Sequence, residues 1–111
     1  YVSRVGKQIR YSHYFFPKGI NVNFYTLNSE NEVCIKTYEK GVERVMRSCA
    51  SGSAAVVFHL AEQNKITSPI TTRSDGGKLF YSFNKNWSTF ESSGPANLCY
   101  RGEFSLKSFD V

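Results

Sequence analysis

One segment of this chain has the pattern of a long helix, and it limits the possible folds more than any other feature. Residues 54–63 (AAVVFHLAEQ) follow a run of small residues and contain neither Pro nor Gly. A serine just before this segment, Ser51 or Ser53, is expected to cap the helix. Because apolar side chains lie nearly all round it, with one polar stripe, we expect the helix to be buried on most of its sides.

Most of the remaining chain alternates apolar and polar residues, which is the period of a β-strand. Residues 20–25 and 32–38 are expected to pair as a hairpin across the polar turn at residues 28–31. Further strands are expected at residues 66–72, 78–83, 87–91 and 98–104, whereas residues 6–14 show no clear period and residues 41–48 resemble a charged loop. The pattern predicts one α+β domain over residues 1–111, with mostly antiparallel strands wrapped around one central buried helix.

Charge and hydropathy narrow the classes of partner. The net charge of +5 is spread along the chain and forms no basic run, so we expect a solvated basic surface and no nucleic-acid partner. No apolar stretch approaches the roughly 20 residues of a membrane span, so no membrane partner is expected.

The cysteines and histidines do not suggest a metal site or a disulfide scaffold. Cys34, Cys49 and Cys99 are odd in number and far apart, and neither histidine stands at a spacing typical of metal ligands. We therefore expect free thiols, no metal and a reducing, cytoplasmic location.

Cys49 is the strongest candidate for chemistry, because it stands among small residues directly before the expected helix. The partial positive charge of a helix N-terminus favours the thiolate form of a cysteine. The free backbone N–H groups of residues 50–53 can also bind a carboxylate. A buried structural cysteine would show the same local sequence, so the local pattern alone leaves both interpretations open.

Five short segments, taken together, carry a resemblance to a known family. They are GINVNF at 19–24, TYEKGV at 37–42, SCASGSA at 48–54, DGGKL at 75–79 and SGPA at 93–96. In order and in approximate spacing they resemble the C-terminal half of diaminopimelate epimerases, and the resemblance runs from about residue 16 to residue 104.

The resemblance implies one half of a pseudo-symmetric fold and a cofactor-independent reaction. Two cysteines of such an enzyme face the substrate α-carbon. One of them, as a thiolate, removes the α-proton, and the other, as a thiol, protonates the opposite face. The reaction interconverts LL- and meso-diaminopimelate for lysine and peptidoglycan synthesis. By this resemblance Cys49 is one of the two, and the second would lie in an N-terminal half that is absent from this chain.

The resemblance also assigns roles to the neighbours of Cys49. Asn21 matches a substrate-binding asparagine, and Glu39 matches an acid that contacts the substrate amino groups. Lys40 stands where the family usually has a carboxylate-binding arginine. Ala50 and Ser51 replace the usual Gly-Thr or Gly-Ser pair after the cysteine and would bind substrate there. A homodimer is a further expectation for the full-length protein.

Two departures from the family pattern keep other functions open. Lysine lacks the bidentate fork that suits a carboxylate, and residues 42–48 lack the usual Glu-Thr and are one residue longer than the family stretch. A related racemase acting on another amino acid, or a decayed copy, fits these departures. From a different class, a small basic binding module without catalysis remains an alternative.

Overall fold

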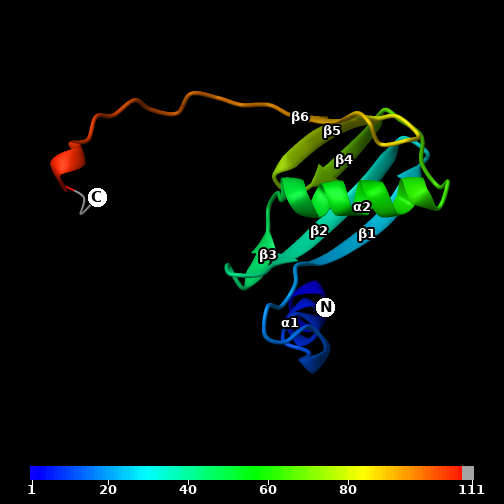
Figure 1. Ribbon diagram of the computed structural model, residues 1–111, viewed down its shortest axis with the longest axis horizontal. Coiled ribbons are helices and arrows are strands. Elements are labelled where there is room, and N and C mark those ends of the chain that lie inside the picture. The colour runs from blue at the N-terminus through cyan, green and yellow to red at the C-terminus, as the bar shows by residue number, and fades with distance from the viewer. Residues whose placement is uncertain (109–111) are drawn as a thin grey trace.

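The computed structural model describes residues 1–108 and shows an α+β fold with two α-helices and six strands in that range. In chain order the elements are α1 (Val2–Arg10), a 3-10 turn η1 (His13–Phe15), β1 (Val22–Ser29), β2 (Glu32–Glu39), β3 (Arg44–Met46), α2 (Ala50–Glu62), β4 (Ile70–Ser74), β5 (Gly77–Phe83), β6 (Phe90–Ser93) and a 3-10 turn η2 (Leu106–Ser108). Figure 1 shows α2 lying across the strands.

The strands form one mixed sheet in the order β1-β2-β4-β5-β6, with β3 added to the end of β2. The expected hairpin is confirmed, because β1 pairs antiparallel with β2 from Val22↔Tyr38 onwards. Only the short β2–β4 contact is parallel among the strand pairs of residues 1–108. Between β2 and β4 the chain passes through α2, which serves as the crossover connection that two parallel strands need.

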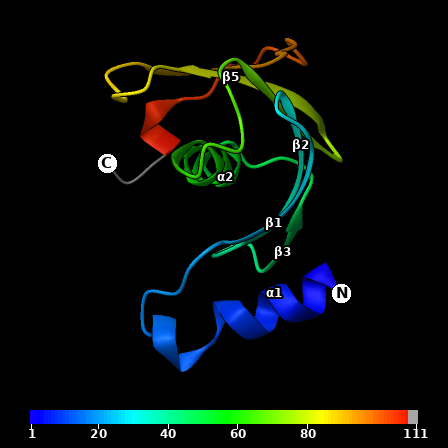
Figure 2. The ribbon, with the colours of Figure 1, turned by 90° about the vertical axis from the view of Figure 1, so that its right-hand side faces the viewer.

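The sheet curves around one side of α2, which lies in its concave face (Figure 2). Alternate residues of the strands point at the helix, and their side chains are almost fully buried together with three residues of α2. This core consists of Val33, Ile35, Val56, Val57, Leu60, Ile66, Ile70 and Tyr81. Each fully buried aliphatic side chain stabilises the fold by about 1.5–3 kcal/mol relative to leaving it exposed, so this face holds α2 against the sheet.

Helix α2 is less buried than the sequence predicted, because its outer side is exposed. The sheet covers the side that carries Val56 and Leu60, while Phe58 on the other side is 51% exposed. In the described range the sheet wraps α2 on one side only. No helix of residues 1–108 is long and apolar enough to cross a membrane.

Helix α1 is an element that the sequence pattern did not predict. Val2, Val5 and Ile9 make a short apolar stripe, and Gly6 lies between them on the same side. Gly6 packs against Tyr38 of β2, where an added Cβ would come within 2.7 Å of the Tyr38 Cβ. The stripe is too short to stand out among nine residues, so the helix was missed as a region without clear period.

The end of the chain also departs from expectation. Residues 87–91 were expected as a strand, but β6 covers Phe90–Ser93, and the expected loop at 41–48 contains β3. No strand forms at residues 98–104. The described chain from Gly94 onwards instead leaves the sheet as an extended arm (Figure 1), and Cys99 lies in it rather than in a strand. Without a neighbouring strand to pair with, alternation alone does not make a β-strand.

Candidate functional site

Cys49 itself caps α2, and the prediction that Ser51 or Ser53 does so was wrong. The Gly52 backbone N–H donates to the Cys49 Sγ at 3.4 Å, and the Ser53 N–H donates to the Cys49 carbonyl at 2.9 Å. The Ser51 hydroxyl lies 3.5 Å from the same sulfur. The half-buried thiol is therefore held at the positive end of α2, among donors that suit a thiolate.

A glycine lets the first turn of α2 approach β1 and β2. A Cβ added at Gly52 would lie 2.5 Å from the Asn23 Oδ1 and 2.7 Å from the Thr37 Oγ1. The Thr37 hydroxyl donates to that Asn23 oxygen at 2.8 Å. This close contact sets the distance between the Cys49 helix and the two strands, and the sequence motif alone did not reveal it.

Three predicted substrate-binding residues come together at the open end of the β1–β2 hairpin. Asn21 precedes β1, Glu39 ends β2, and the Asn21 Oδ1 accepts a hydrogen bond from the Lys40 backbone N–H at 2.8 Å. Gly52 meets the same two strands two residues further in, at Asn23 and Thr37. The fold thus brings these residues to the same end of the hairpin as the Cys49 helix.

Helix α1 fastens the turn that carries Glu39 and Lys40. The Glu43 Oε1 accepts hydrogen bonds from the Arg10 Nε at 3.0 Å and from the Gly41 N–H at 2.8 Å. The Tyr38 hydroxyl donates to the Glu43 carbonyl at 3.0 Å. A hydrogen bond from the Tyr11 hydroxyl, followed by the Gly41 N–H and Arg10, lowers the pKa of the Glu43 carboxyl.

The DGG motif has a structural role beside the site. The Gly76 N–H donates to the Arg47 carbonyl at 2.6 Å, and an added Cβ at Gly76 would lie 2.8 Å from that oxygen. Only glycine permits the β4–β5 turn to approach this closely. The contact holds the segment that leads into Cys49.

Tyr81 is a site neighbour that nothing in the sequence pattern indicated. Its ring lies in the core, and its hydroxyl donates to the carbonyl of Ala50 at 2.9 Å. Burial, with a smaller contribution from the charge of Cys49, raises the pKa of Tyr81 above its ordinary value. Ala50 and Ser51, both exposed at the start of α2, thus have different surroundings: Ala50 is tied to β5, and Ser51 lies beside the sulfur.

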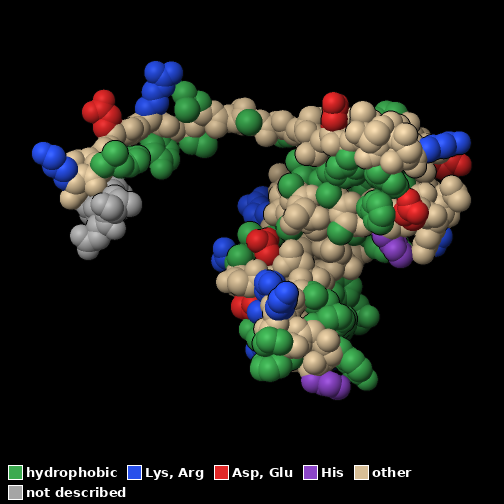
Figure 3. Space-filling view, in the orientation of Figure 1, with side chains coloured by type: hydrophobic (Ala, Val, Ile, Leu, Met, Phe, Trp, Pro, Cys, Tyr) green, Lys and Arg blue, Asp and Glu red, His purple; other side chains and the backbone are tan. Residues whose placement is uncertain are grey.

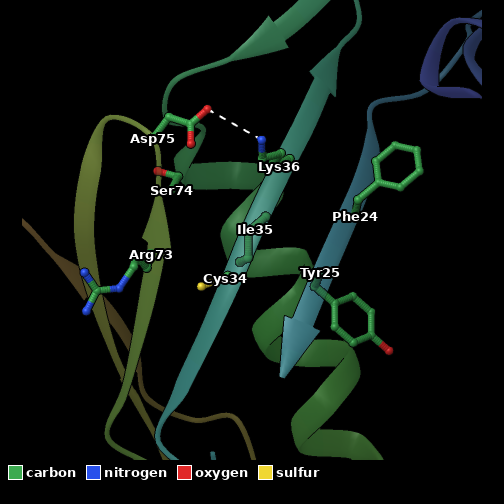
Figure 4. A pocket seen from close by; sticks show the side chains of 8 residues that line it. All are labelled: Phe24, Tyr25, Cys34, Ile35, Lys36, Arg73, Ser74 and Asp75. Carbon is green, nitrogen blue, oxygen red and sulfur yellow. Dashed lines mark ion pairs between the residues drawn. The ribbon is translucent and has the colours of Figure 1, made fainter. Parts of the chain in front are cut away.

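Cys34 belongs to a different part of the molecule. It lies in β2, as expected, and receives a hydrogen bond from the Asn28 amide at 3.0 Å. Together with Arg73 of β4 it lines a pocket of about 240 Å³ (Figure 4), where Lys36 and Asp75 form an ion pair at 3.9 Å. None of the predicted site residues lines this pocket.

Comparison with known proteins extends the resemblance to measured identities. No protein-family model matches the chain. A diaminopimelate epimerase of Flavobacterium psychrophilum is 37% identical over 103 residues, which cover 89% of this chain and 40% of the relative. One of Methanocella arvoryzae is 40% identical over 106 residues, covering 93% of this chain and 36% of the relative. One of Chlorobaculum tepidum is 32% identical over 103 residues, which cover 91% of this chain and 40% of the relative.

The matched region is nearly the whole of this chain but only part of each relative. The chain spans about two fifths of the length of these curated relatives. On these identities, the chain belongs to the diaminopimelate epimerase family.

Proposed function

We propose that this chain is the C-terminal half of a cofactor-independent, two-cysteine epimerase that interconverts LL- and meso-diaminopimelate. The observation that carries the proposal is the position of Cys49 as the cap of α2, with its sulfur 3.4 Å from the Gly52 N–H. Family membership supports the same assignment. On this proposal residues 1–111 form one domain, which is one half of a pseudo-symmetric, cytoplasmic enzyme acting in lysine and peptidoglycan synthesis.

The proposed reaction is a proton exchange at the substrate α-carbon. The Cys49 thiolate takes the α-proton, and the electron pair of the broken C–H bond is left as a carbanion conjugated with the α-carboxylate. The N–H groups at the start of α2 would stabilise the charge on that carboxylate. A thiol from the N-terminal half then donates a proton to the opposite face, so the stereocentre inverts and the thiol and thiolate exchange roles. The reverse direction runs from the other cysteine.

The neighbouring residues would bind the rest of the substrate. The Asn21 amide oxygen is engaged with the Lys40 N–H, which leaves its NH₂ group as a donor toward a carboxylate. Glu39 would hold a substrate ammonium group, and the Lys40 ammonium would hold a carboxylate as a point charge. Ala50 and Ser51 would contribute their backbone N–H groups, and Ser51 also its hydroxyl.

Exposed apolar side chains support a further half as the partner of this chain. Leu98, Tyr100 and Leu106 of the arm are 74%, 84% and 71% exposed. Figure 3 shows hydrophobic side chains along the arm and also over α2. Apolar groups gathered in this way are typical of a surface that another polypeptide covers. We assign that role to the N-terminal half, with homodimerisation as a further proposal for the full-length protein.

Lys40 is the feature that favours the competing proposal, a racemase for a different amino acid. A second carboxylate in the substrate would be bound better by a guanidinium, which makes two charge-assisted hydrogen bonds of roughly 1.5–3 kcal/mol each. In a protein with both halves, Lys40→Arg should preserve or improve diaminopimelate turnover, and Glu39→Gln should reduce it several-fold. If Lys40→Arg abolishes turnover and Glu39→Gln has no effect, the racemase is favoured, and steady-state kinetics on a panel of L-amino acids would show its substrate.

A chimera tests the proposed function directly. This chain would replace the matched segment of the Flavobacterium psychrophilum relative, and stereoinversion of LL-diaminopimelate would be followed with deuterium incorporation from D₂O. We expect turnover in the chimera, none in its Cys49→Ala variant and none in this chain alone. A folded chimera that leaves the substrate unchanged, or a Cys49→Ala chimera that remains active, would contradict the proposal.

A further inference from the structure

Tyr81 links the core of the sheet to the residue that follows Cys49. It lies in β5, opposite Ile70 of β4, and only 1% of its surface is exposed. The centre of its ring lies 5.7 Å from that of Phe90. Its hydroxyl donates to the Ala50 carbonyl at 2.9 Å. The Tyr81 side chain thus extends from β5 to the first turn of α2.

Packing alone does not explain the hydroxyl. A buried hydroxyl that lacks a partner destabilises the fold, and an apolar side chain would fill the same space without that cost. Here the Tyr81 hydroxyl donates to the Ala50 carbonyl at 2.9 Å, and hydrogen bonding by the Ser53 side chain lowers the Tyr81 pKa. The buried hydroxyl therefore has a partner, the backbone carbonyl of the residue next to Cys49.

We propose that Tyr81 is a positioning residue for Cys49, whose hydroxyl fixes the peptide group between Ala50 and Ser51. The Ala50 carbonyl and the Ser51 N–H belong to one planar group, so holding the oxygen also aims the N–H. A donor on the carbonyl further polarises that group and strengthens the N–H as a donor. The Ser51 N–H is one of those that the proposed function directs at the substrate carboxylate, so this inference rests on that proposal.

The hydroxyl keeps its proton over the range in which thiols react. Burial is the main reason that its pKa is raised above the ordinary value of 10.0, while an unperturbed thiol titrates at about 8.5. Tyr81 therefore remains a donor to Ala50 whether Cys49 is a thiol or a thiolate. A tyrosine in this place orients the backbone without competing for the proton.

The test removes the hydroxyl and keeps the ring. In this chain with Tyr81→Phe, two quantities are measured: the alkylation rate of Cys49 by iodoacetamide across pH, and the amide ¹⁵N resonance of Ser51. We expect the Cys49 rate at pH 7 to fall by about threefold, because the first turn of α2, which holds the Gly52 N–H against the Cys49 sulfur, is fixed less firmly, and we expect the Ser51 resonance to shift. Alkylation of Cys34 in the same sample provides an internal reference.

Tyr38→Phe is the matched control, because Tyr38 is also a buried tyrosine whose hydroxyl donates to a main-chain carbonyl, that of Glu43 at 3.0 Å. It should leave the Cys49 rate and the Ser51 resonance unchanged. If Tyr81→Phe changes the Cys49 alkylation rate and the Ser51 resonance no more than Tyr38→Phe does, Tyr81 only fills the core and the inference fails. A Ser53→Ala variant, if Tyr81→Phe does not fold, should shift the Ser51 resonance in the same direction.

The two proposals fail in different ways. If wild-type Cys49 reacts no faster than Cys34, the proposed role of Cys49 is contradicted, and the Ser51 resonance still decides whether the Tyr81 hydroxyl holds the backbone. If wild-type Cys49 is the fast thiol and neither quantity responds to Tyr81→Phe, the proposed function stands and the positioning role is overturned.

Discussion

The start of α2 and the C-terminal arm are two regions of one chain with opposite surroundings. At the start of α2, Gly52 touches β1 and β2, and the Ala50 carbonyl is bonded to β5. In the arm, Leu98 and Tyr100 are 74% and 84% exposed. The chain therefore builds the surroundings of Cys49 from its own strands, whereas its arm has apolar surface that these strands do not bury.

A pair of leucine substitutions should separate the two regions most strongly. Leu60→Ala removes a side chain that is 0% exposed in the core and should cost about 2–5 kcal/mol of unfolding free energy. Leu98→Ala should change that free energy very little, since Leu98 is 74% exposed. Urea unfolding followed by circular dichroism measures both. A similar cost for the two variants would mean that the arm packs onto this domain in solution.

A pair of glycine substitutions sharpens the same contrast for the backbone. Gly52→Ala forces a Cβ against Asn23 and Thr37 and should cost about 1–3 kcal/mol through overpacking. At Gly102 in the arm the nearest atom to an added Cβ is a Tyr100 carbon at 3.9 Å, so Gly102→Ala should be close to neutral. Thermal unfolding of the two variants gives the comparison. A neutral Gly52→Ala would show that α2 can move away from the strands at no cost.

The thiols of the two regions should differ in reactivity. Cys49 caps α2 and accepts the Gly52 N–H, while Cys99 lies exposed in the arm and contacts the Asn97 carbonyl at 3.7 Å. We expect iodoacetamide to modify Cys49 roughly tenfold faster than Cys99 at pH 7, despite its lower exposure. Mass spectrometry of timed samples measures the rates. Faster modification of Cys99 would show that accessibility outweighs the helix N-terminus.

The smallest expected effect concerns pH. The pKa of Glu43 is lowered in the fold, so its contribution to stability is complete above the ordinary value of 4.5 and is lost as the pH falls through the lowered folded value. Melting temperatures of wild type and Glu43→Gln should therefore converge at acidic pH and separate at neutral pH. A separation that stays constant below pH 4.5 would show that the Glu43 charge plays no part in holding the turn next to Lys40.

Much of the fold follows from local patterns. The alternation of apolar residues predicted the β1–β2 hairpin and β5, and the small residues before residue 54 placed Cys49 at the start of a helix. In the arm, the local pattern does not decide the structure. Residues 98–104 alternate as a strand does, but alternation describes which side of a strand is apolar and does not supply the neighbour that makes a strand.

The candidate site divides in the same way. Five short segments in order, three of which contain Asn21, Glu39 and Cys49, carried the resemblance to the family to which the chain belongs. They could not reveal the Arg10–Glu43 ion pair, whose partners are 33 residues apart, or the Tyr81–Ala50 hydrogen bond, whose partners are 31 residues apart. The sequence by itself determined the period of each element and the chemistry of each side chain, because both are local. Only the tertiary structure decided which polar groups meet around Cys49, because that depends on how the sheet curves over α2.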